Sequence, residues 1–428
     1  MSKFLVRLCA AVVSLVACAP SQLQGAASAA DRERTACADP AAAVTVEEQR
    51  LDRPVPQEIL RRSGFDAAVA RFGQDLCRAG SLTAARSVVD VRGRQLWRSA
   101  VDRVQGRGPA QGDLRRDDDR PLYWARLAMA RALRQWQPSF SLEDARREEL
   151  IGRLERTSRG QDAISFGCGD RVKRILVTGF DPFTLDRDIR ISNPSGASAL
   201  ALDGVTVETA SGPARIETVV FPVRWRDFAE GTVERTLLPY FRPGPRRVDM
   251  FTTVSQGRPG RFDVERWNGA WRGGFGDNEN ASSTGVVPIP EDVPAQHPQP
   301  QWTVTTLPYK ALVDAGTGRF PVRDNTSVTE IPAGQSTPVV RDDGPTEGSA
   351  ARAGGGGDYL SNEIAYRATA LRDAVGLKVP GGHVHTPVLT FGAGNPDQVT
   401  DPEFVRNRLD IVAQVRAILT TAAGTLDG

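Results

Sequence analysis

The chain has 428 residues, 40% hydrophobic and 25% charged, which is the composition of a soluble globular protein, and this length favours two domains. Its 54 basic and 52 acidic residues leave a net charge of +2, which excludes an overall field that would recruit nucleic acid or a membrane surface. The three histidines and five cysteines show no spacing typical of a zinc site, and we predict neither a metal nor a cofactor.

The first 29 residues are predicted to be an export signal. Lys3 and Arg7 precede an apolar run over residues 8–17 that is too short to span a bilayer. Two cleavage sites fit the sequence: a bacterial lipoprotein site, slightly favoured, at which Cys18 becomes the lipidated first residue, and an ordinary signal-peptidase site at residues 27–29. We therefore expect an exported protein, either a membrane-anchored lipoprotein or a periplasmic or extracellular protein. Membrane contact is expected only through the lipid.

Three cysteines follow this signal, namely Cys37, Cys77 and Cys168. An exported protein can form one disulfide among them and leave one cysteine over. The pairing stays open, and Cys168 is a candidate for tying a first domain to a second.

Residues 31–160 are predicted to form a mostly helical N-terminal domain. Good helix formers and apolar residues three and four positions apart occur over residues 56–71, 122–136 and 142–156. In the second of these segments Arg126, like Arg131 and Arg134, is expected to reach water. We find no catalytic group of residues in this domain. A glycine-bearing linker is predicted at residues 161–170.

Residues 171–425 alternate between predicted strands and helices. The run at 174–178 (RILVT) is apolar throughout, as expected of a strand buried on both faces of a parallel sheet, and residues 250–254 and 388–391 show the same pattern. Helices are predicted at residues 194–202, 360–375 and 402–422. The alternation favours an α/β domain, with an open, largely parallel sheet flanked by helices and with its site at the carboxyl ends of the strands.

Two polar segments interrupt this alternation. Residues 273–300 and 316–357 are rich in Gly, Pro, Asn, Asp and Thr. We predict that both are loop insertions.

The stretch GGGGDYLSNEIAY, residues 354–366, is the strongest candidate for a functional site. Its four glycines permit a sharp turn, and the residues after Asp358 have the apolar spacing of a helix. Ser361 is thus predicted at the start of a helix, where free backbone N–H groups and the helix dipole favour a nucleophile or an anion. The alternative is that Ser361 only caps the helix.

Two histidines lie close together in GGHVHTP, just before the predicted strand at residues 388–391. In an extended segment the spacing of His383 and His385 places both on one face. Taken alone, each is more often a hydrogen-bonded structural residue than a base.

Five segments resemble, in the same order, segments of the pyroglutamyl peptidase I family. Members of this family are α/β cysteine exopeptidases that remove an N-terminal pyroglutamate. The five segments are ILVTGFDPF with the NPS that follows it, SQGRPGRFDVER, TTLPYKALVDAG, GGDYLSN and GGHVHTP. Together they cover about residues 171–390, roughly half of the chain. Their number and order make coincidence a poor explanation.

The resemblance implies a role for each matching position. Ser361 stands where the family has its nucleophilic cysteine, His385 where it has its base, and Glu265 where it has the carboxylate that orients the base. The backbone at Gly357 and the N–H of Ser361 are the implied oxyanion site. A thiol is partly ionised near neutral pH, whereas a serine hydroxyl must give its proton to the histidine as it attacks.

The resemblance also implies a substrate pocket. Phe180 and Phe183 fall where family members enclose the pyroglutamyl ring between aromatic side chains, and Gln256 and Asn193 fall at its polar contacts. Apolar walls with a few polar groups suit a small neutral lactam. The implied partner is a peptide with an N-terminal pyroglutamate or a similar lactam.

Three functions are predicted, in this order. The first is an exported hydrolase that removes an N-terminal pyroglutamyl group, or a related lactam or acyl group, by a Ser/His/Glu mechanism. The second is a catalytically inactive protein of the same fold that binds the lactam. The third is a structural or interaction protein that acts through the helical domain. The sequence leaves the oligomeric state open.

Overall fold

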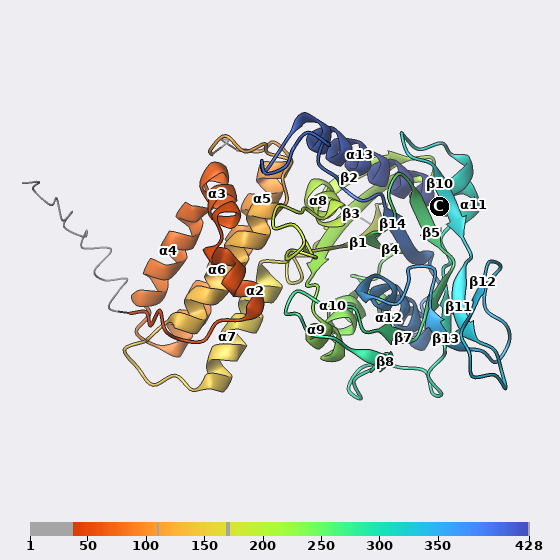
Figure 1. Ribbon diagram of the computed structural model, residues 1–428, viewed down its shortest axis with the longest axis horizontal. Coiled ribbons are helices and arrows are strands. Elements are labelled where there is room, and N and C mark those ends of the chain that lie inside the picture. Colours follow the sequence, from red (N-terminus) through yellow and green to blue (C-terminus); the bar gives the residue numbers. More distant parts are fainter. Residues whose placement is uncertain (1–36, 109–110, 168–171, 427–428) are drawn as a thin grey trace, which may run out of the picture.

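The computed structural model describes residues 37–108, 111–167 and 172–426, which form a helical region followed by an α/β domain (Figure 1). The predicted export signal, with Cys18, lies outside the described residues, and so does Cys168. Within these ranges, no helix combines the length and the apolar character that crossing a membrane requires.

The N-terminal region is helical, as predicted. Its elements are α2 (Val46–Gln49), η1 (Arg50–Asp52), α3 (Pro54–Ser63), α4 (Asp66–Cys77), α5 (Leu82–Val104), α6 (Arg120–Gln135) and α7 (Asp144–Thr157). The single helix expected at residues 56–71 is two helices, because Gly64 ends α3 in the left-handed conformation with φ 75°. We call residues 37–160 the helical region.

The α/β domain is built on one open, seven-stranded sheet with the order β10-β5-β14-β4-β1-β3-β2. The strands are β1 (Lys173–Phe180), β2 (Val205–Thr209), β3 (Gly212–Phe221), β4 (Met250–Gln256), β5 (Phe262–Glu265), β10 (Val322–Asn325) and β14 (Gly381–Thr386). The pairs β1/β3, β1/β4, β4/β14 and β5/β10 are parallel, and the pairs β5/β14 and β2/β3 are antiparallel. This confirms the predicted fold class.

Helices cover both faces of the sheet (Figure 1). They are α8 (Pro194–Leu202), α9 (Trp225–Ala229), α10 (Thr232–Phe241), α11 (Tyr309–Asp314), α12 (Leu360–Ala374) and α13 (Pro402–Gly424). Along β1, Ile175 and Val177 pack into the core that α13 covers, while Leu176 packs into the core that α10 and α12 cover. Burial on both faces explains the uninterrupted apolar run in this strand.

The prediction of a strand at residues 388–391 is wrong, because the strand lies earlier in the chain. It is β14, Gly381–Thr386, so both histidines are on the strand itself. Pro387 follows directly and has no N–H for the ladder. Beyond it, Phe391 leaves the sheet and stacks on Phe404 with ring centroids 4.2 Å apart.

The two segments predicted as loop insertions contain strands. In the first, β8 (Thr284–Val286) pairs with β7 (Trp271–Gly273), and β9 (Trp302–Val304) pairs with β6 (Trp267–Gly269) after the segment ends. In the second, β10 joins the edge of the main sheet. There, β11 (Val328–Ile331), β12 (Val339–Arg341) and β13 (Ala350–Ala353) form a small antiparallel sheet. These short strands are stabilised by pairing with strands that are distant in the sequence. The composition of a segment does not reveal such pairing.

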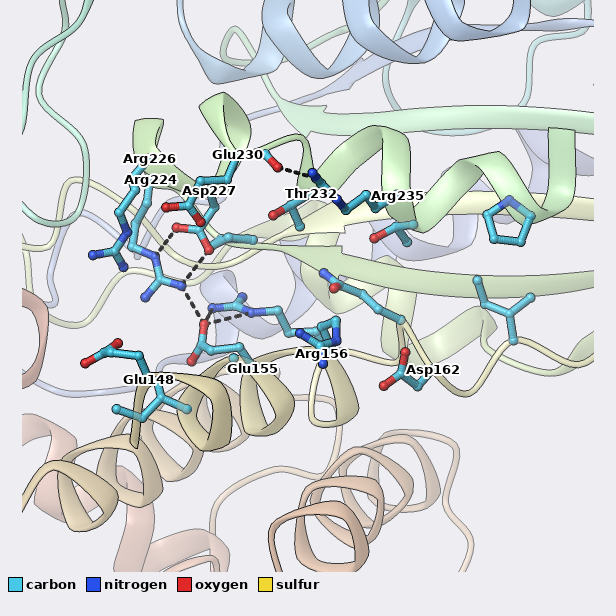
Figure 2. A pocket seen from close by; sticks show the side chains of 18 of the residues that line it. Glu148, Glu155, Arg156, Asp162, Arg224, Arg226, Asp227, Glu230, Thr232 and Arg235 are labelled. Carbon is cyan, nitrogen blue, oxygen red and sulfur yellow. Dashed lines mark hydrogen bonds and ion pairs between the residues drawn. The ribbon is translucent and has the colours of Figure 1, made fainter. Parts of the chain in front are cut away.

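The end of the helical region and the start of the predicted linker are buried against the α/β domain. Arg159 accepts a hydrogen bond from the backbone N–H of Val220 (2.9 Å), and the Gln161 amide donates to the Val220 carbonyl (3.1 Å). A cleft of about 920 Å³ lies beside this junction, between α7 and the segment of α9 and α10, and is lined mainly by charged side chains (Figure 2). In it, Glu155 accepts from Arg159 (2.7 Å) and Arg224 (2.6 Å).

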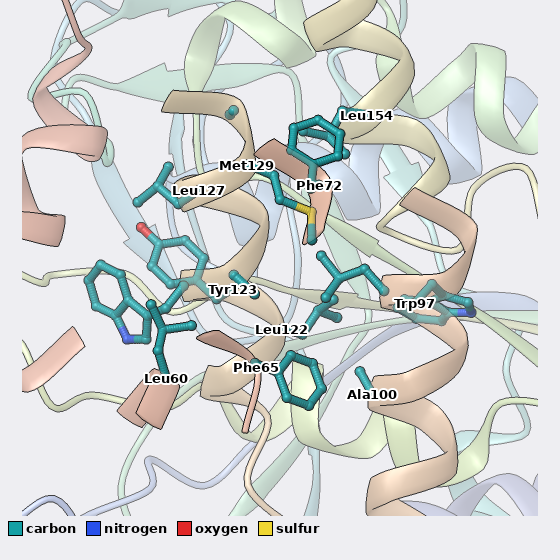
Figure 3. Packing of buried hydrophobic residues seen from close by; sticks show 14 of the residues in the cluster. Leu60, Phe65, Phe72, Trp97, Ala100, Leu122, Tyr123, Leu127, Met129 and Leu154 are labelled. Atoms are coloured by element: carbon teal, nitrogen blue, oxygen red, sulfur yellow. The ribbon is translucent and has the colours of Figure 1, made fainter. Parts of the chain in front are cut away.

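The helical region has an apolar core that continues into the α/β domain. Figure 3 shows part of it, with Phe72, Met129 and Leu154 packed between helices. The same cluster of buried residues includes Leu185 and Val220 of the α/β domain. The two regions therefore share one hydrophobic core.

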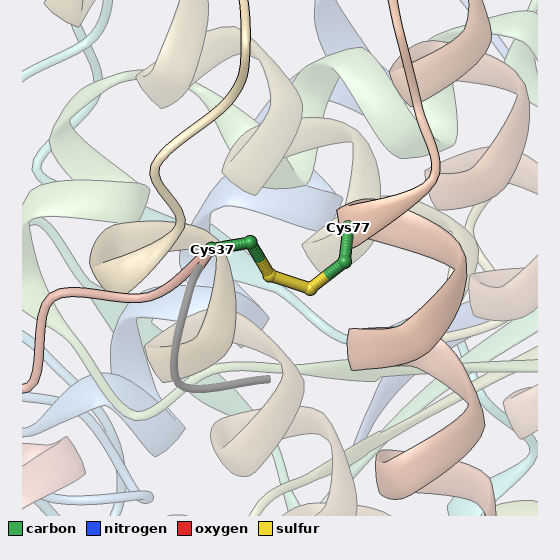
Figure 4. The surroundings of a disulfide bond; sticks show 2 residues. All are labelled: Cys37 and Cys77. Atoms are coloured by element: carbon green, nitrogen blue, oxygen red, sulfur yellow. A yellow bond between two sulfur atoms is a disulfide. The ribbon is translucent and has the colours of Figure 1, made fainter. Parts of the chain in front are cut away.

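A disulfide joins Cys37 to Cys77, with Cα atoms 5.7 Å apart (Figure 4). It ties the chain before α2 to the end of α4. The disulfide expected among the three cysteines thus forms between these two.

The disulfide is expected to stabilise the helical region, because it closes a loop between residues 40 apart in the chain and so restricts the unfolded state. Replacing both Cys37 and Cys77 by serine should lower the free energy of unfolding by about 2–4 kcal/mol. Urea unfolding followed by circular dichroism measures this. Reduction of the parent should reproduce the effect, and equal midpoints for the variant and the oxidised parent would contradict it.

Asp119 should make stability depend on pH. Burial, together with the charge of Asp118, raises the pKa of Asp119 from 3.8 to about 6. Between these values the folded state holds more protons than the unfolded state, so the contribution of Asp119 to stability is lost as pH rises from about 4 to about 6. We therefore compare the free energies of unfolding of the parent and of Asp119→Asn. The value for the parent minus the value for the variant should fall by on the order of 2 kcal/mol over this pH range. Denaturation at several pH values measures the difference, which a constant offset would contradict.

Candidate active site

The candidate site lies at the carboxyl ends of neighbouring parallel strands. Phe180 ends β1, Gln256 ends β4, and His385 is the last residue but one of β14, which runs parallel to β4. The first turn of α12 brings Ser361 to the same edge, where it lines one pocket with Phe180 and Gln256. Open α/β sheets place their sites at this edge.

A buried imidazole and carboxylate form a pair there. Nδ1 of His385 lies 2.7 Å from Oε1 of Glu265, and these residues are 5% and 1% exposed. The other carboxylate oxygen of Glu265 accepts from the Asn325 amide at 2.6 Å. Because a carboxylate only accepts, Nδ1 carries the proton, and Nε2 is left as a base. Asn325 lies on β10 directly opposite Glu265 on β5.

His383 is close to this pair but is held differently. Its ring centroid is 4.6 Å from that of His385, which confirms that both side chains share a face, and its Nδ1 lies 2.7 Å from the Thr253 hydroxyl. Burial, and then the charge of His385, hold the pKa of His383 well below its ordinary value. His383 is therefore a neutral structural residue near neutral pH.

Ser361 does not cap its helix. It is the second residue of α12, after the N-cap residue Tyr359, and its hydroxyl donates to the carbonyl of Gly356 at 3.1 Å. Within the described ranges no hydrogen bond joins Ser361 to His385. The backbone N–H of Ser361 belongs to the first helical turn, which has no acceptor within the helix and can serve an oxyanion.

The implied oxyanion role of Gly357 does not fit this conformation. Its N–H donates to the carbonyl of Gly354 at 2.9 Å, and the N–H of Gly354 donates back to Gly357 at 2.8 Å. This two-way pairing closes the turn before α12. Gly357, with φ 85°, adopts the left-handed conformation.

Two other glycines of the turn, Gly355 and Gly356, are needed for close packing against the His385–Glu265 pair. A Cβ on Gly355 would lie 2.1 Å from Oε2 of Glu265, and one on Gly356 would lie 3.0 Å from Cε1 of His385. Directly after the neighbouring strand β4, a Cβ on Gly257 would lie 2.6 Å from the Cβ of His385. Gly356 thus leaves room for the imidazole, and its carbonyl accepts a hydrogen bond from the hydroxyl of Ser361.

The four pocket residues predicted from the sequence come together with the predicted nucleophile, Ser361. Phe180, Phe183, Asn193, Gln256 and Ser361 line a pocket of about 140 Å³, together with Val223, Ser255, Tyr359 and Leu360. The pocket has aromatic and aliphatic walls, and no charged side chain is among these lining residues. The larger cleft of Figure 2 has no serine, cysteine or histidine among the described residues that line it.

The two amides of the pocket differ in what they can do. The Asn193 side chain accepts from the N–H and hydroxyl of Ser195 (3.1 and 2.8 Å) and donates to the Asp181 carbonyl (2.9 Å). It therefore caps α8 and holds the chain after β1. The Gln256 amide has no hydrogen bond to any described residue, so it is available to a ligand.

Two contributors were missed by the sequence analysis. Asn325 is 60 residues from Glu265 and falls in a segment predicted as a loop, so no local signal points to it. Tyr359 is two residues from Ser361, and its position next to the predicted nucleophile was the available signal. In the part of the chain that the structure describes, no group of His, Cys, Asp and Glu side chains is arranged to hold a metal ion.

The glycine packing gives a test of the site's geometry. Gly355→Ala should push Glu265 away from His385, since its methyl group would overlap the carboxylate. The deshielded Nδ1–H proton of a hydrogen-bonded histidine should be seen by NMR in the parent and lost in the variant. Gly394→Ala, whose Cβ would have no neighbour within 4 Å, is the matched control. A signal that persists in a folded Gly355→Ala protein would contradict this geometry.

Comparison with known proteins finds two family models along the chain. The PA0049 N-terminal domain matches residues 27–155, and the PA0049 C-terminal domain matches residues 174–298 and 318–390. The uncharacterized protein PA0049 of Pseudomonas aeruginosa PAO1 is 35% identical over 503 aligned positions, which cover 90% of this chain and 90% of that protein.

Among solved structures, the chain is similar to pyroglutamyl peptidases, the family that its five segments resemble. A variant of pyrrolidone carboxyl peptidase from Pyrococcus furiosus shares 22% identity, with a TM-score of 0.38 over 59% of this chain and 99% of that chain. Pyroglutamyl peptidase I from Bacillus amyloliquefaciens shares 20% identity, with a TM-score of 0.38 over 60% of this chain and 98% of that chain. By its match to both domains and to PA0049 itself, the chain belongs to the PA0049 family.

Proposed function

We propose that this protein is an exported hydrolase that removes an N-terminal pyroglutamyl group, or a related small lactam or acyl group, from peptides. The observation that carries the proposal is the 2.7 Å hydrogen bond between Glu265 and His385, packed against Gly356, whose carbonyl accepts the hydroxyl of Ser361. The hydroxyl and the base thus lie beside Gly356, and the orienting carboxylate lies beside the preceding residue, Gly355. These are the groups that acyl transfer through serine requires.

The proposed reaction has two steps. Ser361 Oγ attacks the carbonyl carbon of the pyroglutamyl amide, Nε2 of His385 takes the hydroxyl proton and then gives it to the leaving amine, and Glu265 holds Nδ1–H throughout. Water, activated by the same imidazole, then cleaves the acyl ester and restores Ser361. The N–H of Ser361 is the proposed oxyanion donor. The first step requires the hydroxyl to rotate from Gly356 towards His385 once substrate is bound.

The lining of the pocket supports a neutral ring as the substrate group. Phe180, Phe183 and Val223 supply apolar walls, and the Gln256 amide can both donate to and accept from a lactam. The lining residues include no charged side chain that could form an ion pair with the free amine or the carboxylate of glutamate. A pyroglutamyl group carries neither charge, so it enters such a pocket at a lower desolvation cost.

A second candidate function is lactam binding without cleavage. It is favoured by the hydrogen bond that Ser361 donates to Gly356, because a hydroxyl held there is not activated by His385. Under this proposal the pocket is kept and the nucleophile is lost.

Export is part of the first proposal. The disulfide between Cys37 and Cys77 supports it, since disulfides persist in compartments more oxidising than the cytosol. The protein would act as a lipoprotein anchored through Cys18 or as a free periplasmic or extracellular enzyme.

The test is hydrolysis of a pyroglutamyl amide with a chromogenic amine as leaving group. The parent should turn over, and Ser361→Ala should lower kcat/KM by roughly 10³-fold or more, because attack through the hydroxyl is lost. Ser282→Ala is the matched control: it removes an exposed hydroxyl that also donates to a glycine carbonyl, at 2.5 Å, and should leave the rate unchanged.

The other outcomes separate the candidates. An inactive parent with an active Ser361→Cys variant would support the binding protein with a lost nucleophile. If neither protein turns over and calorimetry detects no binding of the amide, both proposals fail.

A further inference from the structure

The segment that connects β1 to α8, residues 181–193, is named the pocket loop here. Phe183 and Asn193 within it line the pocket. Three other apolar side chains of this loop pack into the helical region: Leu185 is in its core, and Ile189 and Ile191 pack against that core. The pocket loop therefore stands between the pocket and the helical region.

Asp181 anchors the start of the pocket loop. One carboxylate oxygen accepts from Arg126 on α6 at 2.6 Å, and the other accepts from Arg159 after α7. All three residues are at most 3% exposed, so Arg126 does not reach water as predicted. Among the described residues, the ion-pair partners of this carboxylate both come from the helical region. A buried carboxylate that loses a partner is strongly disfavoured.

Asp119, just before α6, anchors the end of the pocket loop. Its carboxylate accepts from the Ser192 hydroxyl and from the backbone N–H of Asn193 at 3.3 Å. Asn193 in turn donates through its side chain to the Asp181 carbonyl. The two ends of the loop are therefore joined to each other and to the helical region.

Glu47 on α2 supports the same wall through Asn278. The Asn278 amide donates to Glu47 (3.0 Å) and to the carbonyl of Pro182 (2.9 Å), and its backbone N–H donates to the carbonyl of Val223 (3.0 Å). Val223 lines the pocket. A second segment of the wall is thus connected to the helical region.

We propose that the helical region positions the pocket loop, with Arg126, Arg159 and Asp119 as positioning residues that set the affinity for the lactam without touching it. This inference rests on the proposed function of the pocket. It gives the helical region a specific task at the site.

The test compares two substitutions on one helix in the full chain. Arg126→Met removes a partner of Asp181, while the matched control Arg131→Met removes a partner of Asp52 on the outer side of the bundle. Asp119→Asn is a milder second variant, used if Arg126→Met does not fold. The readouts are hydrogen exchange of residues 181–193 by mass spectrometry, and KM and kcat for the pyroglutamyl amide.

In Arg126→Met and Asp119→Asn, exchange of the pocket loop should rise at least about tenfold, and KM should rise about tenfold or more with kcat changed by less than about threefold. Arg131→Met should match the parent in both readouts. Unchanged exchange of the pocket loop, or an equal rise in β1 and β4, would overturn the inference. If the parent neither binds nor cleaves the amide, the proposed function fails, and the exchange readout alone decides whether the helical region positions the loop.

Discussion

The carboxylate of Asp181 is the point on which the two regions of this protein depend. It follows directly after strand β1, is buried from water, and forms ion pairs with two guanidinium groups of the helical region. Buried ion pairs add little net stability, but each partner forces the others to be present and correctly placed. The ion pairs therefore fix the position of the helices relative to the sheet. Burial of the shared apolar core stabilises the association of the two regions.

Under the proposed function, Ser361 takes the place that a cysteine holds in the pyroglutamyl peptidase I family. The site's imidazole and carboxylate are aligned and held by Asn325, and glycine backbone packs on both. The hydroxyl alone is turned away, towards Gly356. A serine needs the base at the moment of attack, whereas a thiolate can exist before it. The first proposal therefore requires this hydroxyl to turn from Gly356 towards His385, whereas the second does not.

Much of this arrangement could be predicted from the sequence because it is local. Strand β1 is a continuous apolar run, Ser361 follows a glycine turn, and the spacing of His383 and His385 puts both on one face. What could not be predicted depends on distant partners. Helical periodicity assigns Arg126 to solvent, because the pattern does not show that a strand end 55 residues later carries its counter-ion. The four glycines indicated a turn. They did not indicate that a Cβ on three of them would lie within 3.0 Å of a side chain packed against the turn.

The insertion before α12 has a consequence for any attempt to transplant this chemistry. Strand β10 looks peripheral at the edge of the sheet, yet its Asn325 sets the orientation of Glu265, and the same amide donates to the Gly355 carbonyl at 3.1 Å. Trimming the insertion to a minimal scaffold would remove this amide, which joins the carboxylate to the glycine turn. A graft of the serine, histidine and glutamate alone would carry the proposed catalytic side chains without their alignment.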